Sequence, residues 1–297
     1  MLTFYMKQIG GVPHSYHQYF NDDCSDYKFI PHKLDPTSRT IAIGDIHGDL
    51  DVALDALIIS KCIKKVKVEN NDTVRVLNKD EEVEIYEWIG KDTIVVQVGD
   101  QIDNCRPIGD EKCTDENTTK NDEASDVKIL ELYTDIDKIA LKHGGRVISL
   151  LGNHELMNVL GNMNYVSYKN FMLFADEGDD LKTAIKKRKA SFSNKKELNK
   201  LNHFLACTRT SGIIVGSLLF IHGGMVESIA KKYNISNINL LVRKWLLNKL
   251  EDEIEREHIT SYNSKLILVG LLGIAGVGMN YYGSMNNDVG LTILGKA

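Results

Sequence analysis

Four short apolar segments of this chain each end in a polar turn that contains glycine, and this repetition constrains the fold more than any other feature. The turns are GDIHG (44–48), GDQIDN (99–104), GNHE (152–155) and HGG (222–224). Each apolar segment is typical of a buried strand. Open α/β sheets bind their ligands in the loops that follow the carboxyl ends of strands. The four turns therefore predict an α/β protein whose polar loops share one ligand.

The first turn shows how such a site begins. Asp45 and His47 follow the apolar run 41–43 and are two residues apart. Because residues i and i+2 at a strand end point to the same side, they can present an oxygen and a nitrogen toward one point. The flanking glycines allow the backbone to turn tightly and to approach an ion closely.

Across the four turns, the side chains supply carboxylate, amide and imidazole donors without a thiolate, a set that suits hard or borderline divalent metals. The predicted ligands are Asp45, His47, Asp100, Asn153 and His222. Asp100 has two oxygens and can bridge one metal held by Asp45 and His47 to a second held by Asn153 and His222. Two ions about 3.5–4 Å apart activate a bridging water and stabilise in-line displacement at phosphorus, so the set predicts phosphoester hydrolysis.

Two further residues of these turns have acid–base chemistry. His154 follows Asn153 directly and is expected to point elsewhere, which frees it to act as a general acid on the leaving oxygen. Asp103 can supply the carboxylate that orients this imidazole and favours its charged form. Taken alone, each histidine would more often be structural, and the prediction depends on the joint pattern.

In this order, the four motifs resemble those of the calcineurin-like metallophosphoesterases, over about residues 39 to 250. GNHE followed by HGG is more similar to the phosphoprotein phosphatase branch, including its Shewanella-like members, than to the diadenosine tetraphosphatases. The resemblance implies a four-layer α-β-β-α sandwich with a dimetal site at the strand carboxyl ends, where a metal-activated hydroxide attacks phosphorus. It implies the same five ligands and the same pair, His154 with Asp103.

The chain departs from this family pattern in two places. An arginine that usually follows the aspartate of the second motif is replaced by Asn104, so Arg106 or Arg209 is a candidate for binding the substrate phosphate, with a structural role equally open. A histidine expected downstream of HGG is also missing. His258 is the only later histidine, and its charged surroundings favour a solvated helix end.

Composition and cysteine content bear on partners and location. A net charge of −5 carries no basic excess, so no nucleic-acid partner is predicted. The apolar stretch 266–279 is shorter than the roughly 20 residues of a membrane span and contains glycines, so no membrane segment is predicted. The first residues do not resemble a signal peptide. Five scattered cysteines without a CxxC pair favour a reducing compartment. With no signal peptide and no membrane segment expected, the predicted location is cytoplasmic.

The predicted organisation has three parts: an irregular arm over 1–38, a metallophosphoesterase domain over 39–258, and a glycine-rich segment over 259–297 that is either truncated or divergent. Strands are expected at 66–68, 74–76, 83–85, 93–98, 146–151 and, as a pair, in 212–221. Helices are expected at 49–60, 127–142, within 156–203 and at 238–258. The polar segment 106–126 reads as a surface loop that overhangs the site.

The predicted function is a metal-dependent phosphomonoester hydrolase, namely a serine/threonine protein phosphatase with phosphotyrosine as a variant. One alternative is a phosphoesterase for nucleotides or other small molecules. A second is a pseudophosphatase that keeps the fold as a binding module, because of Asn104 and the missing histidine. The donor set accommodates two ions of Mn, Fe or Zn without distinguishing them, and the sequence does not identify regulatory subunits.

Overall fold

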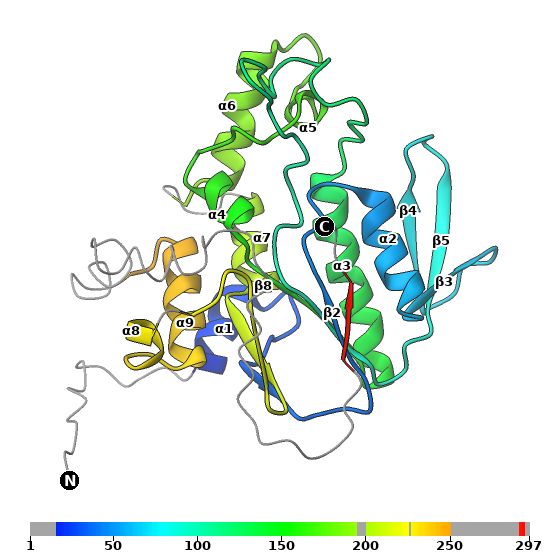
Figure 1. The fold of residues 1–297 in the computed structure, drawn as a ribbon, viewed down its shortest axis with the longest axis vertical. Coiled ribbons are helices and arrows are strands. Elements are labelled where there is room, and N and C mark those ends of the chain that lie inside the picture. Colours follow the sequence, from blue (N-terminus) through cyan, green and yellow to red (C-terminus); the bar gives the residue numbers. More distant parts are fainter. Residues whose placement is uncertain (1–15, 195–199, 226, 251–290, 295–297) are drawn as a thin grey trace.

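The structure is a computed structural model that describes residues 16–194, 200–225, 227–250 and 291–294. Its centre is a five-stranded parallel sheet (Figure 1). The strands, in spatial order, are β11 (Leu291–Leu294), β2 (Thr40–Ile43), β6 (Ile94–Gln97), β7 (Arg146–Leu150) and β8 (Arg209–Thr210). The central strands β2, β6 and β7 are buried along their whole length, which explains why each reads as an unbroken run rather than an alternating pattern.

A second sheet packs face to face on the first. It consists of β1 (Lys33–Leu34), β9 (Gly212–Val215) and β10 (Leu218–Ile221), with β1 parallel and β10 antiparallel to β9. The core between the sheets joins Val96 and Ile148 of the parallel sheet to Ile213 and Phe220 of the second one. Two sheets therefore form a β-sandwich, as the sequence predicts.

Helices cover both outer faces of this sandwich (Figure 1). Helices α2 (Leu50–Ile59) and α3 (Asp126–Ala140) pack on the parallel sheet through residues such as Leu57 and Tyr133. Asp49 caps α2 by accepting a hydrogen bond from the Val52 backbone N–H at 2.9 Å. On the opposite face, α9 (Ile235–Leu246) packs on β9 and β10. The four-layer α-β-β-α arrangement is thereby confirmed.

Two smaller groups of elements flank these layers. An antiparallel sheet of β3 (Ile63–Val66), β5 (Val83–Trp88) and β4 (Thr73–Leu77) lies beside α2 and α3 (Figure 1). The other group packs with α9 around Phe171, Leu205 and Trp245. Its helices are α4 (Asn153–Val159), α5 (Tyr168–Met172), α6 (Leu181–Phe192), α7 (Lys200–Thr208) and α8 (Glu227–Ala230), while a short 3-10 helix, η1 (Leu141–His143), follows α3.

The N-terminal segment differs from the irregular arm that we expected. Residues Tyr16–Cys24 form helix α1, and β1 pairs with β9. A disulfide joins Cys24 to Cys207 of α7 across 183 residues of sequence, and the α1 side chain Phe20 is 1% exposed. The prolines that punctuate this segment suggested a loop, but long-range packing and the disulfide hold it in the fold.

The cysteines also correct the expectation of a reducing environment. A second disulfide joins Cys105 to Cys113, and Cys62 remains a buried free thiol. Sequence spacing could not show these pairs, because a disulfide requires proximity in space and not along the chain. Since disulfides persist mainly in oxidising compartments, the two pairs contradict the reducing compartment inferred from the cysteines, while the cytoplasmic location stays a prediction.

Several sequence predictions concern residues outside the described ranges. These include His258 and the apolar stretch 266–279, while the three-part domain division as a whole stays a prediction. The final helix reaches Leu246 in the structure, and its predicted continuation past 250 is likewise not described. Within the described part of the chain, every helix is too short or too polar to cross a bilayer.

Candidate metal centre

The carboxylate of Asp100, in the loop after β6, lies at the centre of the predicted ligands. Its Oδ2 atom is 3.3 Å from His222 Nε2, in the loop after β10, and 4.0 Å from His47 Nε2, in the loop after β2. His47 Nε2 lies 3.7 Å from Asp45 Oδ2, and His222 Nε2 lies 2.9 Å from Asn153 Oδ1. The structure therefore brings all five predicted ligand residues together at the carboxyl edge of the sheet.

Glycine at position 152 makes this approach possible. A Cβ atom at Gly152 would lie 2.2 Å from Asp100 Oδ1 and 2.3 Å from the Asp100 backbone nitrogen. The turns themselves are strained, since His47 and Asp100 have positive φ values of 51° and 54°. Such conformations persist in non-glycine residues only where the surroundings enforce them, and they are concentrated at functional sites.

The backbone fixes the orientation of both ligand histidines. His222 donates from Nδ1 to the Val98 carbonyl oxygen at 2.9 Å, and His47 Nδ1 faces the Ile102 carbonyl at 3.4 Å. Each ring thus directs Nε2 toward Asp100. A histidine that binds a metal typically gives its other nitrogen to a carbonyl or carboxylate in this way.

The electrostatics of the cluster favour a cation. Burial opposes a charge on His222, but its hydrogen bond to Asp100 and the charges of Asp100 and Asp45 raise its pKa to about 9. The acceptor oxygens Asp100 Oδ2 and Asn153 Oδ1 therefore both face a proton on Nε2. Because these atoms converge on one positive charge, a divalent ion can replace that proton.

The donor atoms form two overlapping groups, in each of which all atoms lie within 4.8 Å of one another. One group contains Asp45, Asp100 and His222, and the other contains His47, Asp100 and His154. Asp100 belongs to both groups, as expected of a bridging ligand. The residues present therefore fit divalent metal ions, with the cluster open to solvent on the side of Asp45 and His47, whose side chains are 30% and 22% exposed.

His154 and Asp103 form the predicted pair. His154 Nδ1 donates to Asp103 Oδ2 at 2.9 Å, while His154 Nε2 faces the cluster, 4.0 Å from Asp100 Oδ2. Burial acts against a charge on His154, yet the hydrogen bond to Asp103 and the charge of Asp100 leave its pKa above the usual value. The imidazole is therefore held in a form that can donate a proton from Nε2.

Sequence reasoning assigned no role to Glu155, the last residue of GNHE. This side chain is 0% exposed, and its carboxylate accepts hydrogen bonds from the backbone N–H groups of Asp100, Gln101 and Gly152 at 3.0, 2.8 and 2.7 Å. It ties the second turn to the third and so holds Asp100 in place. The sequence signal for this role was that Glu155 belongs to GNHE, the motif that also carries the predicted ligand Asn153.

Two other polar residues that the sequence analysis missed hold Asp103. Asn158 donates from Nδ2 to both carboxylate oxygens of Asp103, at 3.0 and 2.8 Å, and Asp126 Oδ1 accepts from the Asp103 backbone N–H at 3.0 Å. Asn158 lies one helical turn after His154 in α4, which is a recognisable spacing. Asp126 lies at the start of α3, and nothing in the sequence connects it to Asp103.

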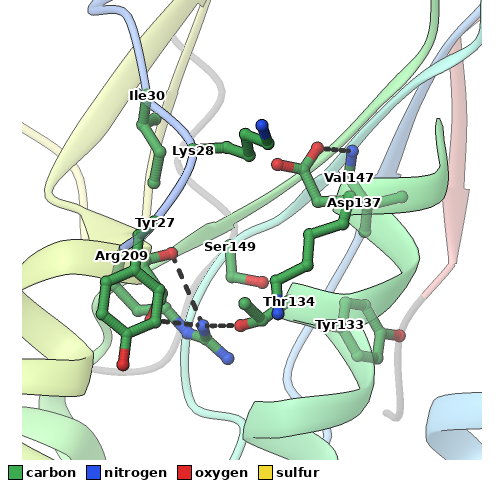
Figure 2. A pocket seen from close by; sticks show the side chains of 11 residues that line it. Tyr27, Lys28, Ile30, Tyr133, Thr134, Asp137, Val147, Ser149 and Arg209 are labelled. Carbon is green, nitrogen blue, oxygen red and sulfur yellow. Dashed lines mark hydrogen bonds between the residues drawn. The ribbon is translucent and has the colours of Figure 1, made fainter. Parts of the chain in front are cut away.

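Arg209 was a candidate for binding the substrate phosphate, and its surroundings favour the structural role that the sequence left open. It is 2% exposed and donates to Gln101 Oε1, Thr134 Oγ1 and the Leu130 carbonyl at 2.9, 2.7 and 2.7 Å. Figure 2 shows its guanidinium directed at Thr134 in a small pocket beside α3. Its donors are therefore used inside the protein.

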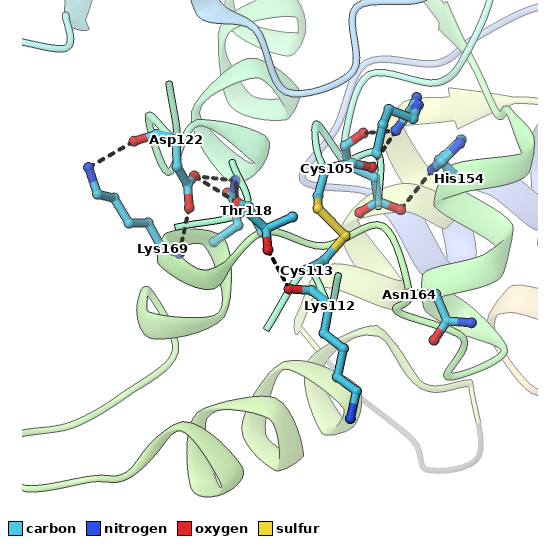
Figure 3. Close-up of a disulfide and its surroundings, with 12 residues drawn as sticks. Cys105, Lys112, Cys113, Thr118, Asp122, His154, Asn164 and Lys169 are labelled. Carbon is cyan, nitrogen blue, oxygen red and sulfur yellow. Dashed lines mark hydrogen bonds and ion pairs between the residues drawn. A yellow bond between two sulfur atoms is a disulfide. The ribbon is translucent and has the colours of Figure 1, made fainter. Parts of the chain in front are cut away.

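Arg106 stays a prediction for phosphate binding. Its side chain is exposed, donates to the Asp103 carbonyl oxygen at 3.0 Å and lies over the Tyr165 ring at 5.5 Å. Tyr165 in turn meets the His154 ring edge-on at 5.1 Å. The Cys105–Cys113 disulfide begins the 106–126 loop close to His154 (Figure 3).

The fold and this centre define an α/β sandwich protein with a metal-binding cluster at the carboxyl edge of its parallel sheet. The sequence profile described as calcineurin-like phosphoesterase matches residues 38–288. Because the match spans most of the sequence, the chain belongs to the calcineurin-like phosphoesterase family.

Two individual proteins match parts of the chain. An uncharacterised protein of Acanthamoeba polyphaga mimivirus is 37% identical over 131 residues, covering 40% of this chain and 50% of that protein. Shewanella-like protein phosphatase 2 of Arabidopsis thaliana is 26% identical over 259 residues, covering 76% of this chain and 56% of that protein. The chain therefore spans about half the length of the curated relatives it matches.

Solved structures share the fold. The crystal structure of a cold-active protein-tyrosine phosphatase from a psychrophilic Shewanella species superposes with a TM-score of 0.51 at 18% identity. The match covers 82% of this chain and 58% of that one. At this identity the comparison establishes the common architecture.

Proposed function

We propose that this protein is a metal-dependent phosphatase that hydrolyses phosphate monoesters on proteins. The observation that carries the proposal is the position of Asp100, whose carboxylate belongs to both groups of converging donor atoms while the His154–Asp103 pair lies beside them. The family membership supports the same reaction, as do the names of two similar proteins, a Shewanella-like protein phosphatase and a cold-active protein-tyrosine phosphatase.

Asp45, His47, Asp100, Asn153 and His222 would hold two divalent ions, and Mn, Fe and Zn all accept these donors. When bound, such a pair of ions lowers the pKa of water and neutralises the charge of a phosphoryl group. The protein contributes the fixed backbone turns and the oriented imidazoles described above. It therefore presents the donors without needing to rearrange them.

The remaining groups act on the substrate. His154 donates the Nε2 proton to the leaving oxygen, and Asp103 keeps the ring oriented and stabilises its charge. Arg106 is exposed beside Tyr165 and binds the phosphate through its planar donor fork. Since Arg106 lies over the Tyr165 ring, that aromatic face is not free to stack a nucleotide base, which favours a protein substrate over a nucleotide.

The test is hydrolysis by the purified chain with added Mn²⁺, using an aryl phosphate and a panel of phosphoserine, phosphothreonine and phosphotyrosine peptides together with nucleotides. We expect peptide hydrolysis that Asp100→Asn lowers at least about 100-fold together with metal content. Arg106→Ala is expected to raise KM with little change in kcat.

Each contrary outcome has a distinct meaning. Faster hydrolysis of nucleotides than of peptides would replace the proposal by a small-molecule phosphoesterase. Tight metal binding without any detectable hydrolysis would replace it by a binding module that has kept the fold. Preference within the peptide panel decides between serine/threonine and tyrosine.

A further inference from the structure

Arg188, in the middle of α6, is a buried cation that the proposed reaction does not use directly. Its side chain is 0% exposed, and its guanidinium lies between the rings of Phe174 and Phe192, with Cζ 5.4 and 5.0 Å from their centroids. Burying an arginine is costly unless its charge is paired and its N–H groups are hydrogen-bonded. The residues that pair with the Arg188 guanidinium are the ones that hold Asp103 beside the candidate centre.

The guanidinium donates to both residues that hold Asp103. Nη2 lies 2.8 Å from Asp126 Oδ2, and Nε and Nη2 lie 3.2 and 3.1 Å from Asn158 Oδ1. Nη2 is also 3.5 Å from Asp103 Oδ1 itself, and Nη1 donates to the Asn170 carbonyl oxygen at 3.2 Å. One planar side chain thus fixes Asp126 and Asn158 relative to each other.

Those two residues determine the conformation of Asp103. Asp126 accepts from its backbone N–H, and Asn158 donates to both of its carboxylate oxygens. Asp103 has a φ of 71°, an uncommon conformation for a non-glycine residue that its hydrogen bonds help to hold. Releasing either partner would let the carboxylate turn away from His154 Nδ1.

The buried charges also indicate that Arg188 stabilises the arrangement of Asp103 and Asp126. Asp103 and Asp126 are both 0% exposed, and Arg188 is the cation that contacts both carboxylates in the described part of the chain. Burial raises the pKa of Asp126 to about 6 despite the opposing effect of Arg188. Without the guanidinium, two buried carboxylates would face each other, which is strongly unfavourable.

We propose that Arg188 is a positioning residue for the His154–Asp103 pair, acting through Asp126 and Asn158 without contact with substrate. The inference rests on the proposed phosphatase function. It predicts a specific defect, since protonation matters for a poor leaving group and matters little for a good one.

The test compares Arg188→Met with wild type on two esters: a phosphoserine peptide, whose alkoxide leaving group needs a proton, and 2,4-dinitrophenyl phosphate, whose leaving group does not. We expect kcat to fall roughly 10–100-fold on the peptide and less than about threefold on the aryl ester, with unchanged metal content. Arg188→Lys keeps the charge but loses the fork and should show a smaller defect of the same kind. It also carries the test if Arg188→Met does not fold.

Arg146→Met is the matched control. Arg146 is likewise a buried arginine, 7% exposed and paired with Asp137 at 2.9 Å, but it lies at the amino end of β7, away from the candidate centre. It should reduce stability without changing the ratio of the two kcat values. If Arg188 had a purely structural role, Arg188→Met would likewise reduce stability and leave the ratio of the two kcat values unchanged.

A second measurement uses Asp103→Asn. If Arg188 acts through Asp103, adding Arg188→Met to Asp103→Asn should lower kcat on the peptide by less than about twofold, because coupled residues are not additive. Equal losses on both esters, or additive losses in the double variant, overturn the inference while leaving the phosphatase function intact. Absence of hydrolysis by the wild type instead overturns the proposed function itself.

Discussion

At the residue scale, the candidate centre depends on side chains that donate nothing to a metal. Glu155 accepts hydrogen bonds from three backbone N–H groups, and Gly152 leaves the space that the Asp100 carboxylate fills. The positions of the metal ligands therefore depend on the turns that carry them. Two substitutions test this view, one at a turn and one at the acid–base pair.

Gly152→Ala should place a methyl group 2.2 Å from Asp100 Oδ1 and displace that carboxylate. We expect metal affinity to fall roughly 10–100-fold, measured by calorimetric titration with Mn²⁺. Gly178→Ala is the control, because its φ of +87° imposes backbone strain whereas a Cβ there meets nothing within 4 Å. Equal affinities in the two variants would show that Asp100 tolerates displacement.

Asp103→Asn removes the charge that stabilises a protonated His154 while keeping the shape of the side chain. Turnover on a phosphopeptide should fall roughly 10²–10⁴-fold, the range typical of general acid catalysis. Metal content, measured by elemental analysis, should stay normal because Asp103 is not among the proposed ligands. Unchanged turnover would reject the acid–base role.

At the element scale, the β3–β5–β4 sheet carries a charged cluster with a definite pH dependence. Hydrogen bonds from Lys65, at 2.7 Å, and from Tyr86 lower the pKa of Glu84 to about 2. A carboxylate with a lowered pKa in the folded state stabilises the protein above its unfolded pKa. That stability is lost as the pH falls from about 4.5 toward 2.

Glu84→Gln should therefore lower the free energy of unfolding near pH 6 by about 1 kcal/mol, the upper range for a pair that is partly open to solvent. The difference between wild type and variant should shrink as the pH approaches 3. Urea unfolding at both pH values measures it. A difference that is constant with pH would mean that Glu84 gains nothing from its partners.

At the scale of the whole molecule, one disulfide joins distant parts of the chain and a second closes a short loop. Cys24–Cys207 fastens α1 to α7, and Cys105–Cys113 closes the start of the loop near His154. Cys62 is 0% exposed, and burial raises the pKa of its thiol, so it should be unreactive in the native state.

Titration with a thiol reagent checks this arrangement. The native protein should show no reactive thiol, the protein unfolded without reductant should show one, and the reduced, unfolded protein should show all five. Three or more thiols in the unfolded, unreduced sample would contradict the pairing. Mass analysis after alkylation identifies which cysteines are involved.

The sequence by itself determined the local part of the structure. Short apolar runs such as 41–43 and 94–97 are typical of strands buried on both faces, and each glycine turn places donors directly after its strand. These are short-range effects, since the residues that cause them are neighbours along the chain. The clustering of Asp45, His47, Asp100, Asn153 and His222 at one edge of a sheet was therefore predictable from the turns, whereas the sandwich was implied by the resemblance to the family.

Tertiary structure alone decided what depends on distant neighbours. The helical conformation of Tyr16–Cys24 accompanies packing against α7, and the burial of Arg209 follows from where β8 joins the sheet. Arg188 meets Asp126 across 62 residues of sequence, and no local pattern records that pairing. Burial, charge pairing and disulfide bonding are properties of proximity in space, which one-dimensional spacing does not contain.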